Sequence, residues 1–137
     1  MTDAAARAGD AEEGIIEGLI AAGSDAALEE AAQRAHRSET KNAAALYEKA
    51  VRARAQLAIK AQDMEKAEAL LASMPESGAA AKMLKELIYD IAESALERVN
   101  YPVAIERFES LGDYSDAAAR REECIYDYGR QLMREQR

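Results

Sequence analysis

Apolar side chains in this sequence recur at the three- and four-residue spacing of an α-helix, with polar side chains between them. Two clear examples are the sets Ile88, Ile91, Ala95, Leu96 and Ala104, Ile105, Phe108, Leu111. Each set falls on one face of a helix and leaves the opposite face polar. The pattern therefore predicts amphipathic helices, each with one buried face.

Helix-breaking and capping residues divide this pattern into seven predicted helices. Gly112 follows an apolar residue and should end a helix with a left-handed backbone. Asn100 lies two residues before Pro102, and proline in the first turn is typical of a helix start. Further breaks are predicted at residues 23–25 and around Ser77, a candidate cap. The predicted helices cover residues 12–22, 25–37, 40–61, 63–73, 77–98, 101–111 and 114–135.

The helical pattern also repeats at an interval of 37 residues. Ile88-Tyr89-Asp90 returns as Ile125-Tyr126-Asp127, Leu71 returns as Phe108, and Met74 returns as Leu111. Several alanines match as well, but they carry little weight in a chain with 32 alanines. A fixed period between 20 and 50 residues is typical of a solenoid, in which stacked helical pairs bury a core that one pair cannot.

Composition supports an all-α fold, because 32 alanines stand against 13 valines, isoleucines and threonines together. We predict an α-solenoid of about three stacked helical hairpins plus a C-terminal helix. Residues 1–11 are expected to be a disordered or frayed N-terminus, and residues 12–137 a single helical repeat domain. The expected repeats cover about 12–49, 50–86 and 87–123, followed by a final helix at 124–137.

The segment NYPVAIERFESLGDY resembles the second helix of a tetratricopeptide repeat (TPR). The matching positions are aromatic Tyr101, small Ala104, aromatic Phe108 and apolar Leu111, preceded by Ile88, Ile91 and small Ala92. The last helix matches through Ile125, Tyr128 and Gly129, in the bulky–bulky–small order of the family. The segment FESLGDYSDAAARREECIY also resembles a degenerate bacterial form of the repeat.

The TPR resemblance covers residues 50–137 and departs from the family at two points. The period is 37 residues where the family has 34, and Asp116 stands where a proline usually closes the repeat. Residues 12–49 fit the pattern loosely, with Gly18 and Ala31 as possible small positions.

The resemblance implies a protein–protein interaction scaffold that holds a peptide or protein segment in a concave groove. Transferred by register, the groove residues are Lys49, Arg52, Gln56, Tyr89, Glu93, Tyr126 and Arg130. The two repeated tyrosines would then face the ligand, although half-buried packing between repeats is an equal interpretation. The alternative function is a structural or oligomerisation module that acts through the ends of the solenoid.

The distribution of charge points to an acidic ligand for this groove. Residues 1–35 carry a net charge of −6, whereas residues 41–60 carry a net charge of +4. Lys49, Arg52 and Gln56 share one helical face, and arginine can hold a carboxylate through two parallel hydrogen bonds. The competing interpretation is that the basic helix complements the acidic end of the same molecule, with Arg52 paired to Glu86 or Glu93.

Several classes of partner are excluded by the sequence. The net charge of −8 is unsuited to general nucleic-acid binding, which needs a basic face. No apolar run reaches the roughly 20 residues that span a bilayer. The N-terminus is acidic where a signal peptide would be basic, and one cysteine fits a reducing compartment. We therefore expect a cytoplasmic protein without nucleic-acid or membrane partners.

The sequence offers no recognisable catalytic or cofactor motif. His36 is the only histidine and lacks a His/Cys cluster, so we expect a surface residue and no metal site. Cys124 is expected in the core, and a small enzyme using its thiol is the weakest hypothesis. No glycine-rich phosphate loop is present, and we predict neither enzymatic activity nor a cofactor.

The final helix carries more apolar surface than one narrow stripe would need. Its larger apolar and aromatic side chains are Ile125, Tyr126, Tyr128, Leu132 and Met133. Terminal elements of a solenoid usually present a polar outer face. We therefore predict that this helix packs against another copy, as in a homodimer, or against residues outside this sequence.

Overall fold

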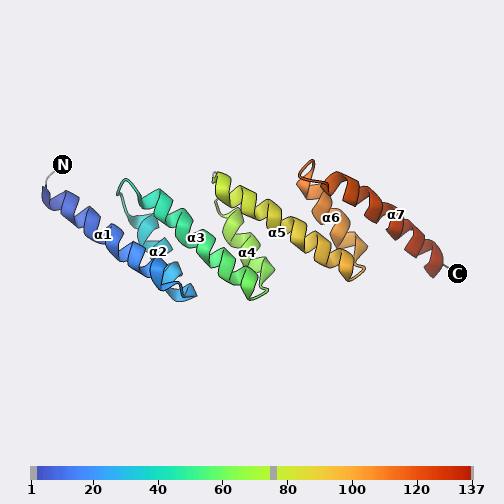
Figure 1. Cartoon of the computed structure of the whole chain (residues 1–137), viewed down its shortest axis with the longest axis horizontal. Coiled ribbons are helices and arrows are strands. Elements are labelled where there is room, and N and C mark those ends of the chain that lie inside the picture. The colour runs from blue at the N-terminus through green and yellow to red at the C-terminus, as the bar shows by residue number, and fades with distance from the viewer. Residues whose placement is uncertain (1–2, 75–76, 137) are drawn as a thin grey trace. The chain divides into compact units, whose positions relative to one another are not determined.

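The computed structural model describes residues 3–74 and 77–136, and within them the chain forms seven helices and no strand. Long and short helices alternate along the sequence (Figure 1). They are α1 (Asp3–Ala22), α2 (Asp25–Arg37), α3 (Ala43–Lys60), α4 (Met64–Ala72), α5 (Gly78–Glu97), α6 (Tyr101–Leu111) and α7 (Ala117–Glu135). Helix accounts for 83% of the described residues, which confirms the prediction of an all-α fold.

The helix boundaries agree with those predicted from the sequence to within three residues, except at the start of α1. This helix begins at Asp3, within the range 1–11 that was expected to be frayed. Alanine is the strongest helix former, and the alanine-rich start of α1 remains helical across Gly9 and Gly14. Pro75 and Glu76, which belong to the predicted break around Ser77, lie outside the described residues.

The predicted breaks at residues 23–25, Ser77 and Gly112 have capping contacts or a positive φ, whereas Asn100 makes no side-chain capping bond. The Ser24 hydroxyl accepts a hydrogen bond from the Ala27 amide at 3.1 Å, and the Ser77 hydroxyl accepts one from the Ala80 amide at 3.0 Å. Gly112 ends α6 with a φ of 60°, a backbone that favours glycine. These contacts stop the helices where the sequence places polar or flexible residues.

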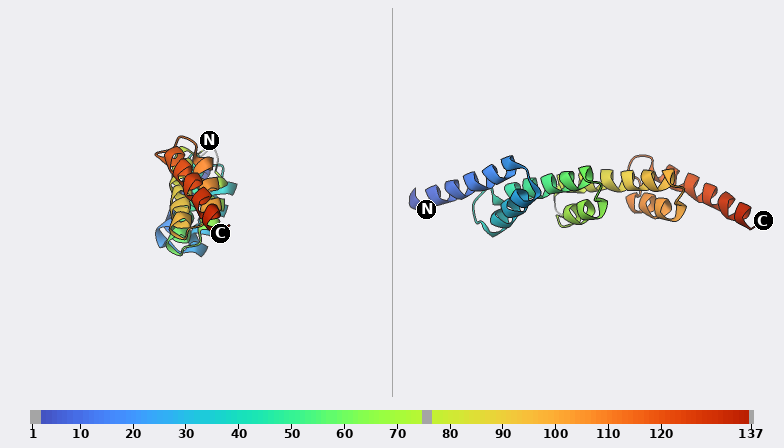
Figure 2. Two further views of the ribbon diagram at one scale, coloured as in Figure 1. Left: turned by 90° about the vertical axis from the view of Figure 1, so that its right-hand side faces the viewer. Right: turned by 90° about the horizontal axis from the view of Figure 1, so that it is seen from below.

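The chain divides into two compact units, residues 1–81 and residues 82–137, and each unit has its own buried side chains. In the first unit the short helices α2 and α4 lie on the same side of the long helices α1 and α3 (Figure 2). Its buried apolar residues include Ile16, Leu28, Ala31, Ala35, Leu46, Ala50, Val51, Ala55, Ala58, Ala67 and Leu71. Of the two possible small positions in this part, Ala31 is fully buried, whereas Gly18 is exposed.

The second unit is built from α6, α7 and all but the first residues of α5. Its core joins the three helices through Ala92, Ala95, Ala104, Phe108, Leu111, Ala117 and Cys124. Phe108 is the largest fully buried side chain and fills the centre of this cluster. Ala92 and Ala104, the predicted small positions, are both fully buried.

The 37-residue repeat is visible in the turn that follows each of α3 and α5. Gln62 and Val99, 37 residues apart, both have a left-handed backbone, with φ values of 62° and 59°. The next amide in each turn reaches back five residues, from Asp63 to Ala58 and from Asn100 to Ala95, at 2.8 Å in both cases. This is the Schellman arrangement of a helix C-terminus, and it turns the chain into the short helix that follows.

The buried positions follow the same interval. Pairs or triplets spaced by 37 residues are buried at Ala43/Ala80/Ala117, Ala50/Leu87/Cys124, Ala55/Ala92, Ala58/Ala95, Ala67/Ala104, Leu71/Phe108 and Met74/Leu111. Surface contacts repeat as well, since the hydroxyls of Ser73 and Ser110 donate to carbonyls three residues earlier at 2.6 and 2.7 Å. The repeat is thus a property of the backbone and the core, and it does not depend on the alanine matches alone.

Val99 is the least favourable residue at the repeated turn, because a β-branched side chain is strained where φ is positive. Its side chain is 51% exposed, so little packing offsets that strain. We predict that Val99→Gly raises the free energy of unfolding by about 1 kcal/mol, measured by urea denaturation. Gln62→Gly, at the same turn 37 residues earlier, should gain less because glutamine is not β-branched. A loss of stability in Val99→Gly would contradict the assigned turn.

Candidate functional site

The residues predicted to line a groove lie on three long helices and belong to both units. Lys49, Arg52 and Gln56 are on α3 in the first unit. Tyr89 and Glu93 are on α5 in the second unit, which also holds Tyr126 and Arg130 on α7. A single groove formed by all seven residues stays a prediction, because the two units are separate compact bodies.

The set on α3 occupies the solvent face of that helix. Lys49 and Gln56 are exposed, and neither takes part in an ion pair among the described residues. The Nε atom of Arg52 lies 3.7 Å from a carboxylate oxygen of Glu48, one turn earlier on the same helix. This Nε–H is enclosed by neighbouring atoms and has no hydrogen-bond acceptor within the described structure. A ligand cannot reach this enclosed atom, so only the outer part of the Arg52 side chain, which is 36% exposed, is open to a ligand.

Tyr89 is held inside the second unit by both its hydroxyl and its ring. The hydroxyl donates a 2.5 Å hydrogen bond to Asp116, the residue before α7. The ring makes edge-on contacts with Phe108 and Tyr114, with centroid separations of 5.6 and 6.4 Å. The hydrogen bond to Asp116, together with partial burial, raises the pKa of Tyr89 to about 12. These contacts match the packing interpretation of Tyr89 better than the ligand-facing one.

Glu93 also contacts α7, whereas the equivalent surface of α7, which carries Tyr126 and Arg130, is exposed. Arg120 lies 3.4 Å from the Glu93 carboxylate and 5.5 Å from the centre of the Phe108 ring. Tyr126, 37 residues after Tyr89, is 68% exposed, and Arg130 lies over its ring at 5.8 Å. The repeated tyrosines therefore have different surroundings, because Tyr89 lies beside the start of α7, where Asp116 accepts its hydrogen bond.

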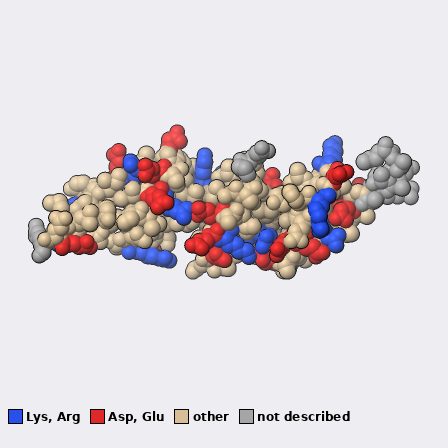
Figure 3. All heavy atoms as spheres, turned by 180° about the vertical axis from the view of Figure 1, so that it is seen from behind, with Lys and Arg blue, Asp and Glu red and all other residues tan. Residues whose placement is uncertain are grey.

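A charge cluster joins the acidic part of the chain to the basic helix. This agrees with the interpretation that the basic helix complements the acidic end of the same molecule. Asp25 accepts from Arg54 at 3.0 Å and from Lys66 at 3.1 Å, so it links α2, α3 and α4. These two bonds, that to Arg54 above all, lower the pKa of Asp25. Acidic and basic side chains are correspondingly intermixed on the face shown in Figure 3. Lys41, Lys49 and Lys60 form no ion pair within the described residues.

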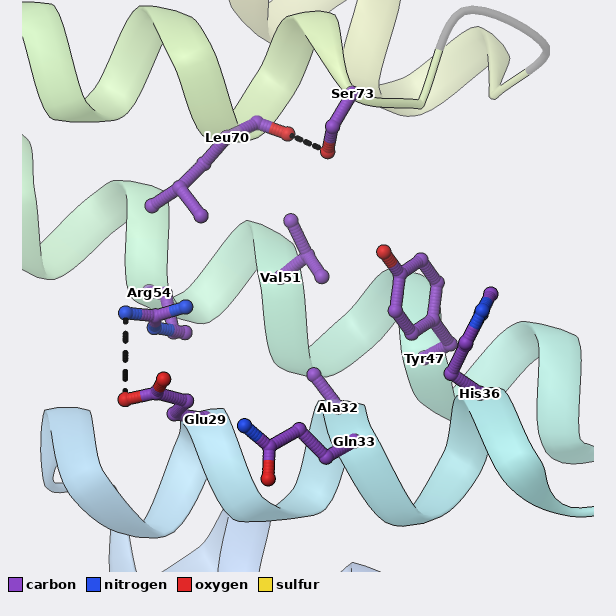
Figure 4. Close-up of a pocket in the computed structure, with 9 residues that line it drawn as sticks. All are labelled: Glu29, Ala32, Gln33, His36, Tyr47, Val51, Arg54, Leu70 and Ser73. Carbon is purple, nitrogen blue, oxygen red and sulfur yellow. Dashed lines mark hydrogen bonds and ion pairs between the residues drawn. The ribbon is translucent and has the colours of Figure 1, made fainter.

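A cleft of about 240 Å³ lies over α3 between α2 and α4, on the face opposite the predicted groove residues (Figure 4). Ala32 and Val51 contribute apolar surface, and the His36 and Tyr47 rings lie 5.4 Å apart at one end. At the other end Arg54 lies 3.9 Å from Glu29. Because Arg54 is already bonded to Asp25, the cleft has no free cation that would favour an anionic ligand.

This cleft was not predicted from the sequence, although the spacing of its residues on α3 can be read there. Tyr47, Val51 and Arg54 are spaced by four and three residues and thus share a face of α3. Nothing in the sequence shows that residues of α2 and α4 stand opposite this face. His36 is exposed at the end of α2, as expected for a surface histidine.

Cys124 lies in the core of the second unit, where burial raises the pKa of its thiol. A buried, protonated thiol is a poor nucleophile, and this supports the packing interpretation over a reactive site. No group of three or more His, Cys, Asp or Glu side chains in the described structure is arranged to hold a metal ion. The described helices also include none that is long and apolar enough to cross a membrane.

Comparisons with known proteins give no family assignment for this chain. No protein-family model matches the sequence, and neither curated proteins nor solved structures give a significant match.

The high pKa of Tyr89 gives a direct test of its contact with Asp116. Folding favours the protonated hydroxyl, so this contact stabilises the protein below pH 10 and is lost as the pH rises through about 12. The phenolate absorbance of the six tyrosines should therefore show one late-titrating group, which Tyr89→Phe removes. Tyr126→Phe is the matched control and should leave the late group in place. If the late-titrating group remains in Tyr89→Phe, the contact between Tyr89 and Asp116 is contradicted.

Proposed function

We propose that this chain is a protein–protein interaction scaffold of the TPR-like type, and that the solvent face of α3 binds an acidic segment of a partner. The observation that carries the proposal is the donor set of Lys49, Arg52 and Gln56. Lys49 and Gln56 are exposed, and the Arg52 side chain is partly exposed on the same face. Three donors on one face suit a carboxylate-rich ligand.

The position of these residues in the repeat supports the same proposal. The repeated turns and core of α3–α4 and α5–α6 define a helical hairpin as the building unit. In TPR-like proteins, which the sequence resembles, the first helices of successive hairpins line the ligand groove. Lys49, Arg52 and Gln56 lie on such a first helix and point away from the buried side that contains Ala50, Ala55 and Ala58.

The charge of the chain favours the proposed orientation of the ligand. The protein has a net charge of −8, and an acidic segment would be repelled by most of its surface. Arg54 and Lys66 are already paired with Asp25 and so offer little attraction. Lys49 and Arg52 are the cations that α3 presents on the face proposed to bind the ligand.

Reversing the charge of Arg52 tests this proposal. We predict that Arg52→Glu reduces binding of acidic peptides at least tenfold while leaving the thermal midpoint nearly unchanged, because the Arg52–Glu48 pair is exposed. A suitable probe is an array of fluorescent peptides that end in two or more Asp or Glu residues. Binding by the native chain should also weaken as salt increases.

Lys41→Glu is the matched control, since it makes the same change of charge on an exposed residue before α3. It should reduce binding by much less than Arg52→Glu. If no acidic peptide binds, or if both variants bind as the native chain does, the α3 surface is not the binding site.

The second candidate function is a structural or oligomerisation module acting through the end of the repeat. It is favoured by the exposed apolar side chains Ile125, Leu132 and Met133 on α7.

A further inference from the structure

The last helix, α7, has an exposed face. Counted by the 37-residue repeat, this face is equivalent to a buried face of α3 and α5. Counted at this interval, four positions of α3 and α5 return on α7. They are Val51/Ile88/Ile125, Ala55/Ala92/Gly129, Ala58/Ala95/Leu132 and Ile59/Leu96/Met133. The four members on the last helix, Ile125, Gly129, Leu132 and Met133, are called the α7 face.

The same positions are covered in α3 and α5 but open in α7. Ala55 and Ala92 are fully buried, whereas Gly129 is exposed, and a side chain added there would meet no atom within 4 Å. Ala58 and Ala95 are buried, whereas Leu132 is 41% exposed. Ile59 and Leu96 are partly buried, whereas Met133 is 72% exposed. An exposed apolar row of this kind on a helix indicates a contact surface.

In the earlier repeats a short helix with a defined pattern covers these positions. In the second unit the cluster around Ala92 contains Ala104 and Phe108 of α6, both fully buried. The equivalent residues in the first unit are Ala67 and Leu71 of α4, which packs against α3. Each covering helix thus has a small residue and a bulky residue four positions later. A buried apolar residue, Met74 or Leu111, follows three positions after that, at or just beyond the helix end.

The residue at position 132 bears on how a helix that covers the α7 face is connected to α7. Ala58 and Ala95 accept the backbone hydrogen bonds of the tight turns that lead directly into α4 and α6. Both alanines are buried where the chain folds back, so a leucine at that place would overpack the turn. Leu132 is therefore better suited to a helix that does not follow α7 through such a tight turn.

We propose that the α7 face binds a short amphipathic helix of a partner protein, with the small–bulky–apolar pattern that residues 67–74 and 104–111 share. The small residue of that helix lies against Gly129, and its bulky residue packs among Ile125, Leu132 and Met133. The helix is about the length of α4 and α6, which have 9 and 11 residues. This site is separate from the cationic face of α3, and the two proposals can fail independently.

A peptide with the sequence of residues 100–113, which includes α6, is the probe. In the native chain α6 already occupies its own place beside α5, so added peptide should bind the α7 face. We expect saturable binding by fluorescence anisotropy, weakened at least tenfold by Met133→Glu in the chain. The same loss is expected from Phe108→Ala in the peptide, and Arg52→Glu in the chain should have no effect.

The control variant is Gln131→Glu, which adds the same charge on the opposite side of α7 from the α7 face. It should bind the peptide as the native chain does, and circular dichroism should show both variants folded. No saturable binding up to about 1 mM peptide, or equal binding by Met133→Glu, would overturn the proposal. A dimer of the chain alone that Met133→Glu dissociates would also overturn it, because a second copy would then cover the face.

Discussion

The close approach of each long helix to the short helix after it is the constraint on which the rest of this structure depends. Ala92 and Ala104 are fully buried in the α5–α6 hairpin, and Ala55 and Ala67 hold the same places in α3–α4. Methyl groups at these positions let two backbones come close, and Leu71 or Phe108 fills the remaining space. The left-handed residue of the turn then sets the direction of the short helix. Larger side chains at the alanines would force the helices apart.

This arrangement explains which surfaces remain for binding. The small residues of α3 face inward, so its long polar side chains collect on the opposite face, where Lys49 and Gln56 are exposed. In α5 the corresponding surface is used internally, because Tyr89 bonds to Asp116 and Glu93 pairs with Arg120. In α7 the face equivalent to the buried face of α3 and α5 is exposed to solvent. Repeats with the same backbone therefore present three different surfaces.

The sequence predicted most of the helices because alanine-rich stretches are separated by strong breakers such as Gly23, Gly112 and Pro102. It predicted the repeat because bulky positions such as Leu71 and Phe108 keep their apolar character at a fixed interval. It did not place the start of α1, where high helix propensity extends the helix into the range 1–11 that was expected to be frayed.

The candidate sites were harder to predict because they depend on contacts between segments that are distant in sequence. The Tyr89–Asp116 bond joins residues 27 positions apart, and the Lys66–Asp25 bond joins residues 41 positions apart. Neither spacing has a local signal. The identical tripeptides that contain Tyr89 and Tyr126 even suggest identical roles, yet only Tyr89 has an acceptor beside it. Position in the repeat, and not residue type, decides the role.

The central claim is that one helix position is closed in α3 and α5 and open in α7. Measuring the free energy of unfolding of Ala55→Leu, Ala92→Leu and Gly129→Leu tests it most directly. The first two should lose about 1–3 kcal/mol by overpacking. Gly129→Leu should lose nothing and should gain up to about 1 kcal/mol, because leucine is the better helix former. A loss at Gly129 as large as that at Ala92, or no loss at Ala92, would contradict the account.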